Sequence, residues 1–433
     1  EIPIWDKRQR DRLRIFTELA RSCEPLITNS TFMQIVRDSK FDVAFAHMYT
    51  YCHIGIIHAA GIPTWAWVNS APMVEHIGNA IGLPMPPSYC SPMAMDAGER
   101  MNFFERVQSF ILHLVTPVMI KYGTSDLETS MFRQYYGTDF PDLWELSRKA
   151  PLLFMNTLEI YDYARPTLHK IINVGGVGLA TQVKKNLTGE FLDLVEKAEE
   201  GVVVVTFGSF APVKLMPDEW KRSLRIVFAK FPKVTFFMRY EEESDEFTRS
   251  LSANVHTRKW LPQAELLHHP KCLGLFTHAG YNSLQDVLHA GLPAITVALF
   301  GDQPHNAQLL AKLKTGINVR KHEMKDPEAL CRAVKRLVHD QSLKAAALRI
   351  RRQIEKRPVS SDQLLIKWTE FLAEFKTTEH FEPYGNHLNF FVYHSLDVIS
   401  FLILIVSVAL SLIVFLLKLA YRVCCLGRKH KVE

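Results

Sequence analysis

The feature that most constrains this chain lies near its carboxyl end, where residues 398–417 run for 20 residues without a charged side chain. At a rise of about 1.5 Å per residue, a helix of that length crosses the roughly 30 Å hydrocarbon core of a bilayer. A buried helix of a soluble protein is the alternative, but such helices seldom contain an uncharged apolar run this long. The sequence therefore predicts one transmembrane helix at 398–417.

The charges on either side of this segment predict its orientation. No Lys or Arg lies between Lys376 and the end of the apolar run. The basic residues that follow it are Lys418, Arg422, Arg428, Lys429 and Lys431. By the positive-inside rule, residues 418–433 form a basic cytosolic tail, and the chain before residue 398 lies on the opposite side of the membrane.

Two further patterns predict the compartment. Lys429 and Lys431 stand five and three positions from the end, which resembles a dilysine signal for retrieval to the endoplasmic reticulum; a merely basic membrane-flanking tail is the alternative. Glycosylation sequons at Asn29 and Asn186 agree with a lumenal body. We therefore expect a single-pass type I protein of the endoplasmic reticulum membrane. Because the chain opens at Glu1 without a signal segment, we also expect an amino-terminal piece to be missing.

Composition narrows the class of protein. A length of 433 residues favours two domains, and 48% hydrophobic with 22% charged residues is typical of packed globular cores. The net charge of +6 comes from scattered basic residues, so nucleic acid is excluded as an expected partner. The five cysteines that precede the apolar run fit neither a metal knuckle nor a dense disulfide framework. We interpret most of them as small buried hydrophobes.

Short apolar segments alternate with helical ones along most of the chain. Strands are predicted at 202–206, 234–238, 274–277 and 294–299, with helices at 218–230 and 305–314. The four valines at 202–205 are typical of a parallel sheet covered by helices on both faces. Earlier segments predict a first α/β unit, with strands at 41–46, 63–68, 151–156 and 171–174 and helices at 54–60 and 99–121. The glycine-rich turn at 175–178 is interpreted as a bend between the two halves.

Ligands of doubly wound sheets bind where strands end, and four segments of the second half suit that position. Residues 206–209 (Thr-Phe-Gly-Ser) would let backbone amides and a hydroxyl approach a phosphate. Residues 260–263 (Trp-Leu-Pro-Gln) place an aromatic plane that could stack on a nucleobase beside an amide.

The other two segments offer groups for a diphosphate and a sugar. Residues 277–283 (Thr-His-Ala-Gly-Tyr-Asn-Ser) lead directly into a helix whose first amides would point at an anion. His278 could add a hydrogen-bond donor there, and Asp286 could accept from ribose hydroxyls. In the segment 300–306, Asp302 and Gln303 offer acceptors and donors for the hydroxyls of a sugar.

These motifs, from Trp260 through Asn306, resemble the signature of the UDP-glycosyltransferase family, the membrane-bound glucuronosyl- and glucosyltransferases of animals. The resemblance implies an α/β GT-B architecture, in which two Rossmann-like domains face each other across a cleft. We therefore expect an acceptor-binding domain at 1–175, truncated at its start, and a UDP-sugar-binding domain at 176–380. A juxtamembrane segment at 381–397, the transmembrane helix and the cytosolic tail complete the expected organisation.

The resemblance also assigns roles to single residues. Trp260 would stack on uracil, and Gln263 and Asp286 would address the ribose. Asp302 and Gln303 would hold the sugar. The residues expected around the diphosphate are Ser209, His278, Gly280, Asn282 and Ser283. The UDP-sugar is a co-substrate, and no further cofactor and no metal is expected. The chain departs from the family at Ala279, where glycine is usual, and at Asp286, where glutamate is usual.

The implied activity is the inverting transfer of a glucuronosyl or glucosyl group from UDP-glucuronic acid or UDP-glucose to a hydroxyl of a small lipophilic acceptor, as in detoxification. The family's base, a histidine near the mature amino terminus, is not in this chain, and His47 occupies the position of its supporting aspartate. His47 could act as a base or orient one; we favour a satisfied polar residue. The alternative function is a non-catalytic nucleotide-sugar binder that partners active relatives. The partners considered for the chain also include a second copy, in a homo-oligomer, and relatives, in a hetero-oligomer.

Overall fold

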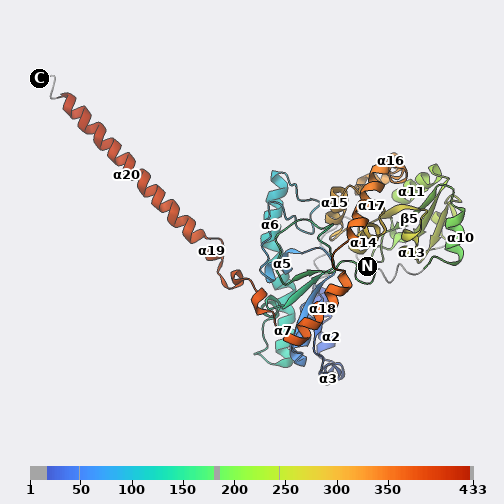
Figure 1. Ribbon diagram of the computed structural model, residues 1–433, viewed down its shortest axis with the longest axis horizontal. Coiled ribbons are helices and arrows are strands. Elements are labelled where there is room, and N and C mark those ends of the chain that lie inside the picture. The colour runs from blue at the N-terminus through green and yellow to red at the C-terminus, as the bar shows by residue number, and fades with distance from the viewer. Residues whose placement is uncertain (1–16, 48, 180–185, 243, 430–433) are drawn as a thin grey trace. The chain divides into compact units, whose positions relative to one another are not determined.

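The computed structural model describes residues 17–47, 49–179, 186–242 and 244–429, with side chains as far as residue 422 (Figure 1). The chain divides into two compact units, one ending at Glu382 and the other beginning at Pro383. Lys431 of the expected dilysine signal lies in residues 430–433, outside the described residues.

The first sheet of the larger unit has four parallel strands in the order β1-β2-β3-β4. The strands are β1 (Ala44–His47), β2 (Trp65–Asn69), β3 (Leu152–Met155) and β4 (Ile171–Asn173). Alternate side chains of β3 enter two different cores: Leu153 and Met155 pack in one, and Leu152 and Phe154 in the other. Because both faces are covered, all four residues of β3 are buried.

Helices surround this sheet, and a capping interaction sets the start of the longest one. The helices are α2 (Glu24–Ile27), α3 (Ser30–Asp38), α4 (Cys52–Ala60), α5 (Glu75–Ala80), α6 (Phe103–Ile120), α7 (Asp126–Tyr136) and α8 (Leu143–Arg148). The helix predicted at 99–121 begins at Phe103 because Asn102 and Glu105 form a reciprocal capping box around its first amides. The π-helix η1 (Lys121–Ser125) joins α6 to α7.

The second sheet has six parallel strands in the order β10-β9-β8-β5-β6-β7. The strands are β5 (Gly201–Thr206), β6 (Val234–Arg239), β7 (Val255–Arg258), β8 (Cys272–Thr277), β9 (Ala294–Thr296) and β10 (Gly316–Asn318). Val202 and Val204 pack in one core and Val203 and Val205 in another, so both faces of the sheet are covered. The predicted parallel sheet is confirmed; β7 and β10 lie at its edges and lack a long apolar run.

Helices of the second half cover both faces of this sheet. They are α10 (Gly189–Lys197), α11 (Asp218–Lys230), α12 (Glu246–Arg249), α13 (Gln263–His268), α14 (Tyr281–Ala290), α15 (Gln303–Lys312), α16 (Pro327–His339) and α17 (Gln341–Glu355), with 3₁₀ turns η2 (Val213–Leu215) and η3 (Lys321–Lys325). The predicted bounds of α11 are confirmed, whereas α15 begins and ends two residues before its predicted range of 305–314, because the helix starts directly after Asp302.

Helix α18 (Ser361–Phe375) returns to the first sheet late in the chain. Leu365, Trp368 and Leu372 pack in the same core as Leu152 and Phe154 of β3. In Figure 1 this orange helix lies among the blue and teal elements of the first half. The 3₁₀ turn η4 (Glu379–Phe381) ends the larger unit.

The second unit consists of the 3₁₀ turn η5 (Tyr384–His387) and the helices α19 (Phe390–Tyr393) and α20 (Leu396–Lys429). The most apolar 18-residue window of α20 has a mean hydropathy of 3.1, and its described side chains are exposed. By length and composition this helix can cross a membrane. The long apolar helix predicted at 398–417 is therefore confirmed as part of α20.

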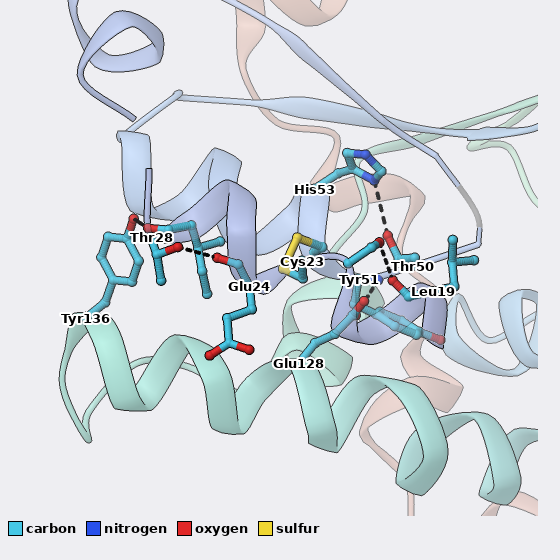
Figure 2. The surroundings of a disulfide bond; sticks show 12 residues. Leu19, Cys23, Glu24, Thr28, Thr50, Tyr51, His53, Glu128 and Tyr136 are labelled. Atoms are coloured by element: carbon cyan, nitrogen blue, oxygen red, sulfur yellow. Dashed lines mark hydrogen bonds between the residues drawn. A yellow bond between two sulfur atoms is a disulfide. The ribbon is translucent and has the colours of Figure 1, made fainter. Parts of the chain in front are cut away.

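A disulfide between Cys23 and Cys52 ties the segment before α2 to the first turn of α4 (Figure 2). Beside it, the buried Glu128 of α7 accepts the backbone N–H of Tyr51 at 2.7 Å. The cysteine spacing does not predict this bond. Its two cysteines are 29 positions apart, and the other thiols that precede the apolar run are odd in number. Cys90 and Cys272 are buried free thiols, as expected, and Cys331 is partly buried.

We expect the disulfide to contribute measurably to the stability of the protein. Replacing Cys52 with Ser, with Cys23 also changed to Ser, should lower the free energy of unfolding by about 2–4 kcal/mol, because the unfolded chain regains the entropy of an open loop. Thermal unfolding of purified protein measures this loss. Cys331→Ser is the control, and equal unfolding midpoints for the double variant and the parent would contradict the bond.

Candidate functional site

Four predicted segments lie together along the edge of the second sheet at which its strands have their carboxyl ends. Since all six strands are parallel, the loops after β5, β7, β8 and β9 leave the sheet on the same side. These loops begin with or contain Ser209, Trp260, His278 and Asp302. The site is therefore a set of strand ends and helix starts, as expected for a doubly wound sheet.

Two of the predicted residues touch directly. Gln263, the first residue of α13, donates its side-chain Nε2–H to Oδ2 of Asp286 on α14 at 2.6 Å. Burial raises the pKa of Asp286 to about 6, with the hydrogen bond from Gln263 acting in the opposite direction. Two polar side chains from separate helices thus form one acceptor-rich group.

His278 is packed between two glycines. A methyl group at Gly208 or at Gly280 would lie 2.6 Å from the ring of His278, so larger residues at either position would displace it. Gly208 also has a φ of +75°, which L side chains rarely adopt. Burial, and then the positive charge of Arg239, lower the pKa of His278 to about 4. The imidazole is therefore neutral at physiological pH and acts as a hydrogen-bonding group.

The amino-terminal end of α14 is suited to an anion. Its N-cap, Gly280, has no side chain with which to cap the helix, so amides of the first turn remain for a ligand. The side chain of Asn282 is exposed, whereas Ser283 is buried. Ala279 has a φ of +64°, a conformation in which glycine avoids the cost of a Cβ. Ala279, which stands where the family usually has glycine, is therefore in a strained backbone conformation.

Asn306 links the sugar-binding candidates to the start of α14. Its Nδ2–H groups donate to the carbonyl of Ala279 at 3.0 Å and to Oδ2 of Asp302 at 2.7 Å. Burial raises the pKa of Asp302, and the Asn306 contact lowers it. Oε1 of Gln303 accepts hydrogen bonds from the backbone N–H groups of Leu299 and Phe300. Only the amide nitrogen of Gln303 is then left for a ligand, fewer groups than the sequence suggests.

Arg239, at the end of β6, is a site residue that the motifs do not reveal. Its guanidinium donates to the carbonyls of Gly208 at 2.5 Å and Lys259 at 3.2 Å, which joins the loops after β5 and β7. It also lies 5.8 Å from the ring centre of Trp260. Trp260 is 73% exposed, and Ser209 is exposed as well, so both face solvent beside this guanidinium.

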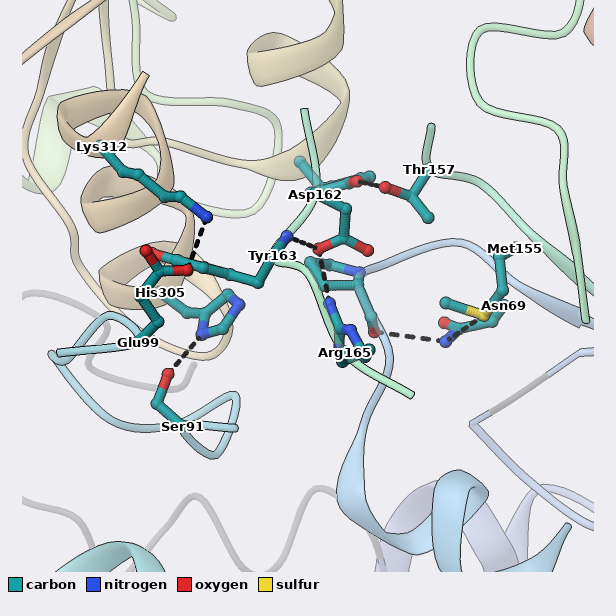
Figure 3. Close-up of polar contacts among 12 residues, drawn as sticks. Asn69, Ser91, Glu99, Met155, Thr157, Asp162, Tyr163, Arg165, His305 and Lys312 are labelled. Atoms are coloured by element: carbon teal, nitrogen blue, oxygen red, sulfur yellow. Dashed lines mark hydrogen bonds and ion pairs between the residues drawn. The ribbon is translucent and has the colours of Figure 1, made fainter. Parts of the chain in front are cut away.

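Helices α14 and α15 also contact the first half of the chain. Tyr281 donates its hydroxyl to Thr157 at 2.6 Å, and Gln285 donates to the carbonyl of Asn156 at 2.8 Å. On α15, Lys312 pairs with Glu99 at 2.6 Å and lies over the ring of Tyr163 (Figure 3).

His305, one turn after Asp302, makes a further contact of this kind. Its Nδ1 lies 3.3 Å from the hydroxyl of Ser91, and its ring packs on Tyr163 (Figure 3). Burial, and then the charge of Arg165, lower the pKa of His305 to about 4. A neutral, buried imidazole thus joins α15 to the loop that precedes α6.

His47 lies at the carboxyl end of β1, in the first sheet. Its Nε2 is 3.2 Å from the hydroxyl of Ser70, and its ring packs on Tyr49. Partial burial, and then the neighbouring His53, lower the pKa of His47. The ring has a polar partner, and its neutral form can also accept a proton. Among the described residues, no group of three His, Cys, Asp or Glu side chains could hold a metal ion.

Comparison with known sequences decides the family. The family described as "UDP-glucoronosyl and UDP-glucosyl transferase" matches residues 5–432. The chain belongs to this family. It is 28% identical to a putative UDP-glucuronosyltransferase of Caenorhabditis elegans, ugt-48, over 88% of this chain and 73% of that one. It is 27% identical to human UDP-glucuronosyltransferase 2B7, over 95% of this chain and 76% of the relative. The predicted family and enzyme class are confirmed.

Solved structures agree on the fold of this family member. The glycotransferase of kitacinnamycin aligns with a TM-score of 0.58 at 15% identity, covering 85% of this chain and 83% of its own. The calicheamicin glycosyltransferase CalG4 aligns with a TM-score of 0.51 at 17% identity, covering 87% and 83%. The predicted GT-B glycosyltransferase fold, with its two parallel sheets, is confirmed.

Replacing Asp286 should have opposite effects on the stability of the protein and on its binding of UDP. Its folded pKa is raised from 3.8 to about 6, so the ionised form costs stability above pH 6, and this cost fades as the pH falls from 6 to 4. Asp286→Asn should raise the unfolding free energy at pH 7.5 by about 1–3 kcal/mol while weakening UDP binding.

Thermal unfolding at pH 7.5 and pH 4.5, with calorimetric titration of UDP, measures both effects. The exposed Asp193→Asn is the control. Two results would show that folding does not raise the pKa of Asp286: an Asp286→Asn variant that is less stable than the parent at pH 7.5, or a stability difference that does not shrink on acidification.

Proposed function

We propose that this UDP-glycosyltransferase moves a glucuronosyl or glucosyl group, with inversion, from its UDP-sugar to a hydroxyl of a small lipophilic acceptor. The observation that carries the proposal is the edge of the second sheet, where an aromatic plane, the Gln263–Asp286 pair, the uncapped start of α14 and Asp302 converge. These groups match the parts of a UDP-sugar in order: base, ribose, diphosphate and hexose.

Each residue takes the role that its contacts support. Trp260 stacks on uracil with Arg239 beside it, and Gln263 and Asp286 bind the ribose hydroxyls. Asp302 and the amide nitrogen of Gln303 bind the hexose. The groups that hold the diphosphate are the amides of Gly280 and Ser283, the side chains of Ser209 and Asn282, and the neutral ring of His278.

The transfer needs a base on one side of the anomeric carbon and anion stabilisation on the other. The acceptor hydroxyl loses its proton, its oxygen forms a bond to the anomeric carbon, and the bond from that carbon to the β-phosphate oxygen breaks. The departing UDP gains negative charge, which helix-end amides and His278 stabilise without a metal. His47 is the candidate base of the described chain, since its lowered pKa keeps the ring neutral.

We assign different functions to the successive parts of the chain. Residues 1–175 bind the acceptor and residues 176–380 bind the UDP-sugar, although α18 packs on the first sheet. Residues 381–397 connect to the transmembrane helix 398–417, and 418–433 form the cytosolic tail. Lipophilic acceptors partition into the bilayer, so an anchored enzyme meets them at high concentration.

We place the body of the protein in the lumen of the endoplasmic reticulum. The Cys23–Cys52 disulfide suits an oxidising compartment. Asn29 is exposed and caps α3 through its amide oxygen, which leaves the nitrogen that a glycan would modify; Asn186 is exposed as well. Lys429 and Lys431 then act as the retrieval signal.

Release of UDP tests the proposed reaction. The full chain in membranes should release UDP from UDP-glucuronic acid or UDP-glucose when phenols and steroids are supplied, and His47→Gln should abolish the release while UDP still binds. Release that His47→Gln does not change would remove His47 from the chemistry. Bound UDP without any turnover would favour the nucleotide-sugar binder.

Trp260→Ala should weaken UDP binding by about 1–3 kcal/mol, the usual value of a base stacked on an aromatic ring. Calorimetric titration with UDP measures the loss. Tyr384→Ala, which removes another highly exposed aromatic ring, is the control, and unchanged affinity in Trp260→Ala would refute the stacking assignment.

Asp302→Asn should change the choice of sugar more than the binding of UDP. The carboxylate is proposed to accept from hexose hydroxyls, whereas UDP alone offers it none. The ratio of kcat/KM for UDP-glucuronic acid to that for UDP-glucose should shift at least about tenfold, equivalent to about 1.4 kcal/mol, with UDP affinity within twofold. Equal losses in both would contradict this role.

A further inference from the structure

His305 of α15 is a buried polar residue to which the proposed donor chemistry gives no role. It stands three positions after Asp302, the N-cap of the same helix, so the two belong to one helical turn. Its partners lie in the other half of the chain: Nδ1 is 3.3 Å from Oγ of Ser91, and the ring centre is 4.8 Å from that of Tyr163 (Figure 3). A side chain next to the proposed sugar-binding residues thus reaches the first half.

The hydrogen bonds of Ser91 decide which nitrogen of His305 carries the proton. The hydroxyl of Ser91 donates its one proton to the carbonyl of Ala97 at 2.9 Å, so its oxygen is an acceptor toward His305. The ring of His305 is neutral and must therefore have its proton on Nδ1, which donates to Ser91. Nε2 carries the lone pair; it is buried and has no hydrogen-bond partner among the described residues.

Burial gives the contact between His305 and Ser91 its strength. His305 is 4% exposed and Ser91 8%, so water does not replace the bond when it is lost. A donor and an acceptor would then stay unpaired in the interior, which costs more than losing an exposed bond. The first turn of α15 is therefore held firmly where it meets Ser91.

The same face of α15 has two further contacts with the loop that precedes α6. Gln308 donates to the carboxylate of Asp96 at 2.9 Å. Lys312 pairs with Glu99 at 2.6 Å. Because they follow His305 at intervals of three and four residues, all three side chains share one face of the helix. The two additional contacts are partly exposed to water and individually weak, so they align α15 along the loop while the buried contact fixes its start.

The loop at 87–101 is itself bonded to the first half. Oε1 of the buried Glu75 on α5 accepts the backbone N–H of Met93 at 2.5 Å. The hydroxyl of Ser109 on α6 donates to the carbonyl of Pro87 at 2.7 Å. The loop thus lies between two helices of the first half and α15, and it connects the first turn of α15 to the half that is proposed to bind the acceptor.

We propose that His305 is a positioning residue for the proposed transfer. Through Ser91, it sets where Asp302 and Gln303 hold the hexose relative to the acceptor. His305 is itself buried, so this role, which rests on the proposed function, is exerted through the residues that it holds in place.

The position of the hexose decides which nucleophile reaches the anomeric carbon. In transfer the acceptor oxygen forms the new bond, whereas in hydrolysis a water oxygen does. In both reactions the bond to the β-phosphate oxygen breaks, UDP leaves with its electron pair, and the base takes the proton of the nucleophile. A displacement of about 1 Å can lower such a rate on the order of 100-fold. Losing the contact of His305 should therefore lower transfer more than hydrolysis, with UDP binding unchanged.

Two substitutions separate the hydrogen bond from the space that the ring fills. His305→Asn keeps an N–H donor as many bonds from the backbone as Nδ1, whereas His305→Gln places its amide near the position of Nε2. We expect His305→Asn to keep kcat for transfer within about threefold of the parent, and His305→Gln to lower it by about tenfold or more. In both variants UDP affinity, measured by calorimetric titration, should stay within about twofold, and UDP release without an acceptor should not fall. Equal losses of transfer in the two variants, or a parallel loss of UDP binding, would show that the ring only packs and would overturn the proposal.

Ser91→Ala removes the acceptor without adding volume, so it gives an answer even if a variant of His305 does not fold. It should lower kcat for transfer as much as His305→Gln does, and the two changes together should cost no more than either alone, because both remove one contact. The control is Ser147→Ala, which removes a buried serine bonded to the carbonyl of Trp144 and should leave transfer unchanged. Additive losses from Ser91→Ala and His305→Gln would contradict a role exerted through Ser91.

Hydrogen exchange measures the same link without turnover and so separates this proposal from the proposed function. UDP-glucose or UDP-glucuronic acid should slow the exchange of amides at 87–101 in the parent and in His305→Asn but not in His305→Gln, because the donor orders the first turn of α15. This protection in a parent that transfers no hexose would support the link and contradict the proposed reaction. Exchange at 87–101 that the UDP-sugar does not change in the parent would overturn the positioning role, whether or not hexose is transferred.

Discussion

The structure depends on one constraint: the six strands of the second sheet run parallel, so their carboxyl ends meet at a single edge. Residues 51 positions apart in sequence, such as Ser209 and Trp260, therefore come to the same edge of the sheet. The helix starts that follow β8 and β9 lie at this edge, and their amides create positive potential there. This geometry makes the edge suitable for a nucleoside diphosphate before any side chain is considered.

Helices α14 and α15 carry the proposed donor site and also hold the two halves together. On α14, Asp286 contacts Gln263, whereas Tyr281 and Gln285 bond to the first half. Asp302 begins α15, and Lys312 at its other end pairs with Glu99. Because a helix moves as a rigid unit, the first half and the donor edge are mechanically linked. The loops of the first half that are proposed to bind the acceptor are thus linked to the residues that are proposed to bind the sugar.

Much of this could be predicted from the sequence, and the omissions have physical causes. The valine run of β5 and the glycine-rich start of α14 are local patterns, so the sheet and the site segments were predictable. Contacts distant in sequence leave no such pattern: the guanidinium of Arg239 on the carbonyl of Gly208, the Cys23–Cys52 bond and the return of α18 to the first sheet. A helical period shows that α18 is a helix but not which sheet it covers. Equally, the acceptor capacity of Gln303 is lost to amides of its own loop.

We propose above all that the edge formed by these strand ends binds UDP with its base on Trp260. Photolabelling with a UDP-sugar that carries an azide at C5 of uracil tests it most directly, because the reactive group lies on the base itself. We expect the adduct to fall on the peptide containing residues 258–263 and excess UDP to prevent it. An adduct confined to the first half of the chain, or one that UDP does not displace, would show that uracil does not stack on Trp260.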